Sequence, residues 1–554
     1  MSGITRNRDL GFFDDDLTKE AILRLSECKS ITLFVGAGAS LDLNLPTWSS
    51  LVAKLLEQTV ARRFNVPSDP DTARMICDEL VKTLFQVQSA SLVDSYLSTE
   101  LKDSMSELTS AQRYIKMLEV RNHRLRECLY EHDHLAGIAR KSTLVGKLLE
   151  VAILLKQVDE DRDVHIITTN YDNAIEEASL QEPYASVMLR DGIKLAIFAD
   201  AHPTPDDLQG KDVIPVVHIH GLLRSPSGHA VNANRPHTLG QVVFSEADYM
   251  DWETGCFRHY LRSRVTAGGL LTIGASLRDN NVLTHLREGS GTSSKLEPRY
   301  ALLPSQDDLA HLATKTDIPE EYWSPFLDMA VLRGHIFGLQ ILRPDFHGQV
   351  FQFLQELGVK ALAEKSNVTY IPYSDRIRNW ANTWSGIRES ELPSVRDNME
   401  SSCRELAEEF ESLPHFDHCK IEVWARRNPD DRTMERCCSS QSTRRMGTWP
   451  HTALIKPLSE RSAILSFIRR STVTIPIDGE SDRRWTHSLT APVTLTESPW
   501  SGLPVGAVEV LLHAQNPTSE EALPYLRANA DNLTERITKL GVRILTPSPW
   551  STDL

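Results

Sequence analysis

Four short motifs in this sequence combine glycine with side chains that can orient hydroxyl groups or carry protons. Each follows a run of apolar or β-branched residues, the pattern of a buried strand. The motifs are Val35-Gly36-Ala37-Gly38-Ala39-Ser40, Thr168-Thr169-Asn170-Tyr171-Asp172, His218-Ile219-His220-Gly221 and Ile273-Gly274-Ala275-Ser276-Leu277-Arg278-Asp279. Ligands of open parallel sheets bind beyond the carboxyl ends of the strands. All the motifs therefore fall where such a ligand is expected.

The first motif is a Gly-x-Gly turn, which can bind an anion. At Gly36 and Gly38 the absence of a Cβ lets backbone N–H groups approach a pyrophosphate closely. The same turn also occurs in plain strand–helix connections, so by itself it does not distinguish the two uses. The motif lacks the lysine of a P-loop, which argues against ATP hydrolysis.

The next motifs offer an amide and an imidazole. Asn170 can orient hydroxyl groups and an attacking water without adding charge. The ordinary pKa of histidine, about 6.5, lies near working pH, so His220 can accept a proton. Both motifs have structural alternatives, because a single histidine often serves packing and Asp172 can simply cap a helix. In the last motif, Ser276 either contacts a ribose or phosphate or caps a turn.

The elements that must position these motifs alternate between strands and helices. Apolar runs predict strands at 31–35, 165–169, 213–219, 270–274, 299–303 and 337–342. Helical spacing covers 17–28, most of 48–157 and 347–357. Buried strands separated by helices indicate a parallel sheet covered on both faces. We therefore expect an α/β, Rossmann-like domain with a helical insertion.

A different pattern begins after a boundary near 358–373. An amphipathic helix is predicted over 394–413 and a terminal helix over about 519–540. Strand-like segments between them lie at 420–426, 452–455, 472–477, 489–495 and 505–513. A helix, antiparallel strands and a second helix indicate a smaller α+β domain.

Composition argues against several partners and sites. The formal net charge of -15 argues against direct nucleic-acid binding, because Lys and Arg contacts to phosphate carry that affinity. We interpret the basic stretch 121–140 as a solvated helix face. No apolar run approaches the roughly 20 residues that cross a bilayer, and no secretory signal is recognised. The cysteines include no C-x-x-C pair, so we expect no structural zinc site and a cytoplasmic protein.

Taken together and in this order, the motifs resemble the NAD-binding core of the sirtuin superfamily. More specifically, they resemble the bacterial sirtuin-like domains of antiphage defence proteins. Pro46-Thr47-Trp48 and Ala301-Leu302-Leu303-Pro304 extend the resemblance, which covers roughly residues 15–358. The helical stretch between Trp48 and Gln157 is matched only loosely.

The resemblance implies roles for individual residues. It assigns Asn170 and His220 to catalysis, and it assigns NAD contacts to Gly36, Ala37, Gly38, Ser40, Thr169, Asp172, Gly274 and Ser276. The turn of Gly36 to Ser40 would hold the pyrophosphate and nearby ribose, and Gly274 and Ser276 the adenosine side. Asp172 would position the ribose or support the structure. Trp48 would either edge the pocket or pack in the core.

The implied activity is hydrolysis of NAD to nicotinamide and ADP-ribose. Deacetylase sirtuins carry a zinc module held by four cysteines, which has no counterpart in this spacing, and Thr169 replaces their Gln. Water is therefore the expected acceptor, NAD the substrate, and no metal is required. The resemblance suggests an abortive-infection effector that forms homo-oligomers. The alternatives are a non-hydrolytic NAD or ADP-ribose sensor, and a protein deacylase or ADP-ribosyltransferase.

The end of the chain is similar to GAF domains, which sense small ligands or partners. The segments Ser488-Leu489-Thr490-Ala491-Pro492-Val493 and Gly506-Ala507-Val508-Glu509-Val510, followed by a long helix, carry this resemblance. The expected organisation is an NAD-binding domain at 1–360 with a helical insertion at about 50–158, a linker at 361–384 and a GAF-like sensor at 385–554. A small molecule or a protein would act as the trigger at that sensor.

Overall fold

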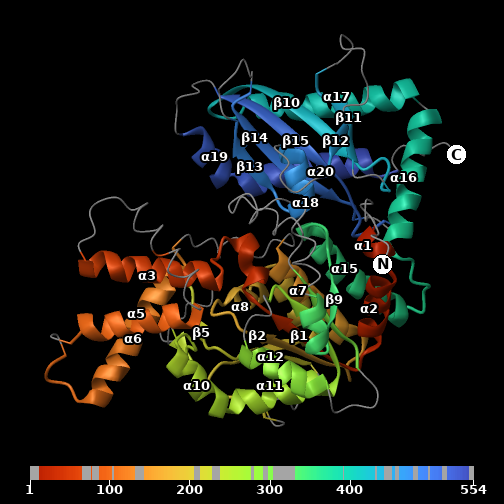
Figure 1. The fold of residues 1–554 in the computed structure, drawn as a ribbon. Coiled ribbons are helices and arrows are strands. Elements are labelled where there is room, and N and C mark those ends of the chain that lie inside the picture. The colour runs from red at the N-terminus through yellow and green to blue at the C-terminus, as the bar shows by residue number, and fades with distance from the viewer. Residues whose placement is uncertain are drawn as a thin grey trace.

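The protein is described from a computed structural model, in which the chain forms two sheets with their covering helices (Figure 1). The structure describes residues 11–64, 77, 86–102, 105–131, 143–204, 207, 212–226, 238–275, 280–290, 297–303, 331–390, 392–430, 433–441, 452–455, 461–477, 485–496, 500–514 and 521–547. We call the first sheet with its helices the N-terminal unit and the second sheet with its helices the C-terminal unit.

The N-terminal unit is built on a parallel seven-stranded sheet of order β3-β4-β2-β1-β7-β8-β9. Its strands are β1 (Ser30–Val35), β2 (Asp163–Thr168), β3 (Lys194–Phe198), β4 (Val213–His218), β7 (Gly269–Ile273), β8 (Arg299–Leu302) and β9 (Gln340–Leu342). The strands β5 (Leu222–Leu223) and β6 (Thr238–Leu239) form a separate two-stranded sheet. The expected α/β fold with a parallel sheet is confirmed, and the edge strand β3 was not predicted.

Helices cover both faces of this sheet, so its strands are apolar on both sides. Leu33 of β1 joins a core with α1 (Gly11–Asp14), α2 (Asp16–Glu27), α7 (Leu144–Val158) and α15 (His347–Lys365). Phe34 joins a second core with α10 (Glu246–Thr254), α11 (Cys256–Ala267) and α12 (Asn280–Ser290). The alternation of side chains along a strand accounts for this division. Shorter elements are η1 (Ala37–Leu43) after β1, α8 (Ala174–Ser179) after β2 and α9 (Tyr184–Asp191) before β3.

The helices α3 (Trp48–Phe64), α5 (Gln86–Glu100) and α6 (Ser110–Leu129) extend to one side of the sheet (Figure 1). A buried arginine ties them to the sheet, because Arg121 of α6 bonds Asp94 of α5 at 2.9 Å and Asp248 of α10 at 2.8 Å. Arg124 is also buried and pairs with Glu100. The interpretation of 121–140 as a solvated helix face is therefore wrong for these two arginines, and residues 132–140 lie outside the described ranges.

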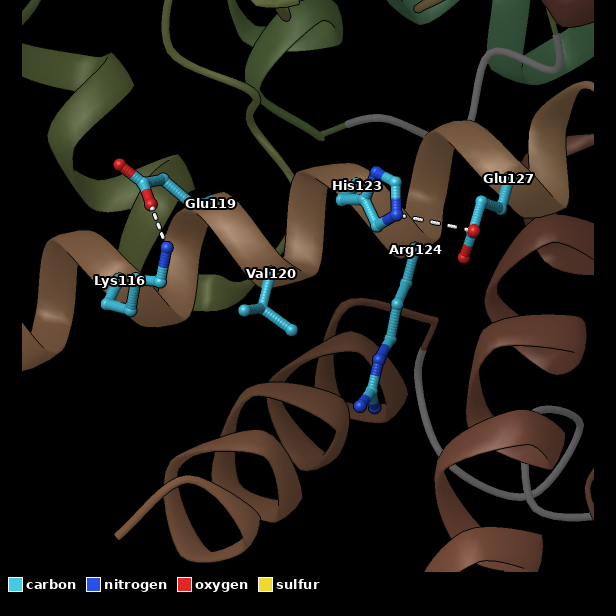
Figure 2. A pocket seen from close by; sticks show the side chains of 6 residues that line it. All are labelled: Lys116, Glu119, Val120, His123, Arg124 and Glu127. Atoms are coloured by element: carbon cyan, nitrogen blue, oxygen red, sulfur yellow. Dashed lines mark hydrogen bonds and ion pairs between the residues drawn. The ribbon is translucent and has the colours of Figure 1, made fainter. Parts of the chain in front are cut away.

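Away from Arg121 and Arg124, the outer face of α6 is exposed to solvent. Figure 2 shows a shallow hollow along this helix, where Lys116 pairs with Glu119 at 2.8 Å and His123 with Glu127 at 3.3 Å. The two members of each pair lie about one turn apart on the same helix and are exposed, so the side chains of each pair bind each other at the surface. The hollow is a charged helix surface and has no contact with the four motifs.

The C-terminal unit is built on an antiparallel six-stranded sheet of order β12-β11-β10-β15-β14-β13. Its strands are β10 (Phe416–Ala425), β11 (Thr433–Ser439), β12 (Thr452–Leu454), β13 (Val473–Pro476), β14 (His487–Thr494) and β15 (Pro504–Ala514). Val423 packs with α17 (Leu392–Glu411) and α20 (Ala530–Leu545), whereas its neighbour Trp424 packs with α18 (Ser462–Arg469). The sheet thus has helices on both faces, and α19 (Ala522–Ala528) precedes α20.

Residues 361–384, expected as a linker, form the end of α15 and most of α16 (Tyr373–Ser390). The indole N–H groups of Trp380 and Trp384 donate to the carbonyls of Leu545 and Ile544, at 2.8 and 3.2 Å. Helix α16 is therefore packed against the end of α20 in the C-terminal unit. No helix within the described residues is both long and apolar enough to span a membrane.

Candidate functional site

The motifs meet at the carboxyl edge of the parallel sheet because their strands are neighbours. Val35 at the end of β1 is paired with Thr168 of β2 on one side and with Ile273 of β7 on the other. Thr168 is in turn paired with His218 of β4. The loops after these strands therefore leave the sheet at the same level, side by side.

The glycines of the first and last motifs pack against each other. A Cβ on Gly36 would lie 2.5 Å from the Cα of Ala275, and one on Gly38 would lie 2.8 Å from the carbonyl oxygen of Gly274. The N–H groups of Gly36 and Gly38 donate to the carbonyls of Ile273 and Gly274, at 2.9 and 2.8 Å. The two turns are thus one interlocked structure, in which only glycine leaves enough room.

Ser40 connects the first motif to the second. Its hydroxyl accepts a hydrogen bond from Nδ2 of Asn170 at 3.2 Å and donates one to Oδ2 of Asp172 at 3.1 Å. All three side chains are buried. Burial raises the pKa of the Asp172 carboxyl, although hydrogen bonds from the Ala174 N–H and from Ser40 oppose that rise. Asp172 also accepts the Ala174 N–H at 3.1 Å, so it binds the first residue of α8 and Ser40 at once.

Asn170 is held by three of its four polar groups. Its backbone N–H donates to Oγ1 of Thr168 at 3.0 Å, its carbonyl lies 3.1 Å from Nδ1 of His218, and its Nδ2 donates to Ser40. The fourth group, Oδ1, is buried and has no hydrogen-bond partner among the residues that the structure describes. Because buried polar atoms are nearly always paired, Oδ1 of Asn170 is the natural acceptor for a bound hydroxyl group or water.

His218 is a site residue that the sequence reasoning did not select. It is fully buried at the end of β4, and its Nε2 lies 2.6 Å from Oε1 of Glu176 in α8. Burial lowers the pKa of His218, but the charge of Glu176 and the hydrogen bonds to Glu176 and Asn170 outweigh it, so the pKa is raised. The signal available in the sequence was the repeated histidine of His218-Ile219-His220.

His220 lies in the loop after β4, and Asn170 lies in the loop after the adjacent strand β2. Thr168 and His218 are paired on the adjacent parallel strands β2 and β4, and Asn170 and His220 follow them by two residues each. The carbonyl of His220 accepts the Val243 N–H at 3.0 Å, and its ring packs edge-on against Trp252 at 5.9 Å. Gly221 follows with φ +83°, and a Cβ there would lie 2.6 Å from the Gln241 carbonyl oxygen, so this sharp turn needs glycine.

The remaining candidates have different surroundings. Trp48 is half-buried, and its indole N–H donates to the hydroxyl of Tyr171 at 3.2 Å, a contact that fits packing behind the site. Thr169 is half-buried, and its N–H bonds the carbonyl of Val35 at 3.2 Å. Ala37 is half-buried in the first turn of η1, and Ser276 lies outside the described residues. Within the described ranges, no three His, Cys, Asp or Glu side chains are grouped to hold a metal ion.

Part of the chain that carries these residues matches a known family. Residues 164–323 match the model of the SIR2-like domain, a stretch that contains Asn170, His218, His220 and Gly274. The match supports a place in the sirtuin-like superfamily and an NAD-related function. The Gly36–Ser40 turn precedes the matched stretch, but Ser40 is hydrogen-bonded to it. No curated protein matches the chain.

Proposed function

We propose that this protein is an NAD hydrolase, which cleaves NAD to nicotinamide and ADP-ribose. The observation that carries the proposal is the buried Oδ1 of Asn170. The other polar groups of this residue, its backbone N–H, its carbonyl and Nδ2, are hydrogen-bonded within the protein, so Oδ1 is the group available to a ligand. It lies within a stretch that matches a SIR2-like domain, and such domains use NAD. NAD is the substrate in this proposal, and the chemistry needs no metal.

The proposed reaction breaks the bond between C1′ of the ribose and the nicotinamide nitrogen. The bonding electron pair leaves with nicotinamide, whose ring loses its positive charge, while positive character develops on the ribose. Water then adds to C1′ and releases one proton. Asn170 would hold a ribose hydroxyl or that water through Oδ1, and His220 would take the proton. A positioned base typically contributes on the order of 10²–10⁴-fold in rate.

The glycine turns would shape the cradle for the rest of the dinucleotide. Gly36 and Gly38 pack closely on the turn of Gly274, and Ser40 ties these turns to Asn170 and Asp172. In this proposal Gly36, Gly38 and Gly274 act through their shape, since the N–H groups of Gly36 and Gly38 are already bonded to carbonyls. Ala37, Thr169 and Ser276 complete the proposed contacts with NAD.

The proposal includes control by the C-terminal unit as a GAF-like sensor in an antiphage effector. Three consecutive residues support such coupling. Phe346 packs on Phe467 of α18 with ring centroids 6.2 Å apart, and Gly348 lies against the carbonyl of Ile468. Between them, Nε2 of His347 pairs with Oδ1 of Asp42 at 3.1 Å. Asp42 belongs to η1, the helix that carries Ser40, so a shift of α18 has a short route to the site.

The direct test is a time course of nicotinamide release from NAD by the purified full chain, with and without extract from phage-infected cells. We expect release that Asn170→Ala and His220→Ala abolish. The matched control is His165→Asn, because His165 is equally buried but lies on the sheet strand β2, where it bonds Asp163 and Tyr260. It should remain active. Intact NAD under every condition would refute the proposal.

The products separate the alternatives. Free ADP-ribose indicates hydrolysis, whereas ADP-ribose attached to a protein, or loss of an acyl group from one, indicates transfer or deacylation. Tight binding of ADP-ribose without turnover indicates a sensor. Oligomeric state is measured in the same samples by light scattering, with a homo-oligomer expected.

A further inference from the structure

His218 stands out as a buried, titratable group that the proposed reaction does not use. Its ring is 0% exposed, and both ring nitrogens face oxygen acceptors: the Asn170 carbonyl at 3.1 Å and the Glu176 carboxylate at 2.6 Å. Only an imidazolium can donate from both nitrogens at once, since a neutral ring keeps one proton. The arrangement therefore matches a charged ring.

The surroundings of the ring favour that charge. The charged groups that act on it are Glu176 of α8, by direct hydrogen bond, and Asp172 of the loop after β2. Both are acidic, and Glu176 is itself buried. A hydrogen bond between charged groups in such a site is stronger than one between neutral groups. Positive charge on His218 is thus compensated from two elements.

We propose that His218 is a positioning residue of the NAD site, which holds the main chain of Asn170 so that its side-chain oxygen faces the substrate. This inference rests on the proposed function. The N–H of residue 170 is tied to Thr168 and its amide to Ser40, so the carbonyl held by His218 is the last fixed point of that residue. Without it, the main chain at Asn170 is free to shift, and the side chain with Oδ1 shifts with it.

The proposal predicts an alkaline limit to activity. When the ring loses one proton, the neighbouring Glu176 favours retention of the proton on Nε2, and Nδ1 then presents a lone pair to the carbonyl of Asn170. The hydrogen bond becomes a repulsion, and Asn170 loses its alignment. Because the pKa of His218 is raised, this limit lies above the ordinary histidine value of about 6.5.

Three variants separate positioning from a merely structural role. In His218→Asn the amide nitrogen can replace Nδ1 and does not titrate, so we expect kcat within about tenfold of wild type and no alkaline limit. In His218→Leu no donor remains, so we expect kcat to fall by about 10- to 100-fold, the cost of an unpaired buried carbonyl. In Glu176→Gln the amide can donate to Nε2, which leaves Nδ1–H for Asn170 and should also remove the limit.

The matched control is Glu177→Gln, one residue along the same helix. Glu177 is equally buried but accepts its hydrogen bond from Asn173. We expect it to keep the alkaline limit of wild type. The measurement is kcat for nicotinamide release between about pH 6 and 9.5, with thermal melting of each variant to check folding.

The outcomes are distinct. The proposal is overturned if His218→Asn or Glu176→Gln keeps the wild-type alkaline limit, or if His218→Leu is folded and fully active. If His218→Leu does not fold, the other two profiles decide. Should wild type fail to release nicotinamide, the proposed function fails, and the pH dependence of ADP-ribose affinity in the same variants tests the role of His218 by itself. No ADP-ribose binding by wild type would overturn both.

Discussion

The amide of Asn170 lies 3.2 Å from the hydroxyl of Ser40, although 130 residues separate them along the chain. One serine oxygen accepts from Asn170 and donates to Asp172, so the first glycine motif and the second are one hydrogen-bonded structure. The geometry of Asn170 therefore depends on a residue of η1, the helix that follows β1.

Replacing Ser40 with alanine should impair the site and weaken the fold. The change leaves Nδ2 of Asn170 and Oδ2 of Asp172 without this partner, and both side chains are buried. Unpaired buried polar groups cost about 1–3 kcal/mol each, so we expect a lower melting temperature and NAD turnover reduced by at least tenfold. Ser26→Ala is the control, because Ser26 is equally buried but bonds the Leu23 carbonyl in α2. Equal activity losses in the two variants would contradict the prediction.

An alanine at Gly274 should be far more damaging than one at Gly192. Both glycines have positive φ, +64° and +71°, which costs an L-residue about 1–2 kcal/mol. A Cβ at Gly274 would also lie 2.4 Å from the backbone nitrogen of Ala39, whereas one at Gly192 would meet nothing within 4 Å. The clash adds about 1–3 kcal/mol, as overpacking does. Denaturant unfolding of both variants measures the difference, and similar midpoints would show that the turns are not interlocked.

Removing the charge of Arg121 should destabilise the N-terminal unit. Arg121→Met leaves Asp94 and Asp248 without their shared cation, and Asp248 is 1% exposed. Breaking one side of a buried pair costs about 3–5 kcal/mol. Lys116→Met on the same helix removes an exposed pair with Glu119 and should change stability by less than about 1 kcal/mol. A small effect of Arg121→Met on the unfolding free energy would mean that water solvates the two aspartates.

The contact between α15 and η1 should transmit changes to the site. His347→Ala removes the pair with Asp42, whose other bond among the described residues is to the Leu144 N–H at 3.1 Å. We expect weaker NAD binding, seen as a KM raised several-fold, because Ser40 lies in the same helix. His123→Ala removes a comparable pair, His123 with Glu127, on the exposed face of α6 and should leave KM unchanged (Figure 2). An unchanged KM in His347→Ala would contradict the proposed route from α18.

Two buried histidines should affect stability with opposite dependence on pH. The raised pKa of His218 means that its stabilising contribution is complete below the unfolded value of about 6.5 and is lost as pH rises through the higher folded value. Burial lowers the pKa of His165, although Asp163 opposes this, so its contribution is complete above about 6.5 and falls as pH drops. Melting temperatures between pH 5.5 and about 9 should thus show His218→Asn approaching wild type at high pH.

For His165→Asn the same series should show the approach to wild type at low pH. Each variant serves as the control for the other, because both lose a fully buried ring from the same sheet. Parallel curves for the two variants would mean that neither ring changes its protonation on unfolding.

Much of the parallel sheet could be predicted from the sequence, because buried strands and covering helices leave local patterns. The runs at β1, β2, β4, β7 and β8 were located within two residues of their observed bounds. β3 was missed because Lys194–Phe198 is an edge strand of mixed, partly exposed residues. β11 was missed because its Glu435 and Arg436 read as surface residues, although Arg436 is buried against Glu422.

By itself, the sequence determined that glycine turns, an amide and an imidazole follow predicted strands, and a parallel sheet brings the ends of its strands to one edge. Only the tertiary structure decided which side chains touch there. The order of the strands sets β1 between β2 and β7, so Ser40 reaches Asn170 and Gly38 packs on Gly274. The strand order also places His218 of β4 against the carbonyl of Asn170. Such a hydrogen bond joins segments that are distant in the sequence, so the residue spacing within one strand does not predict it.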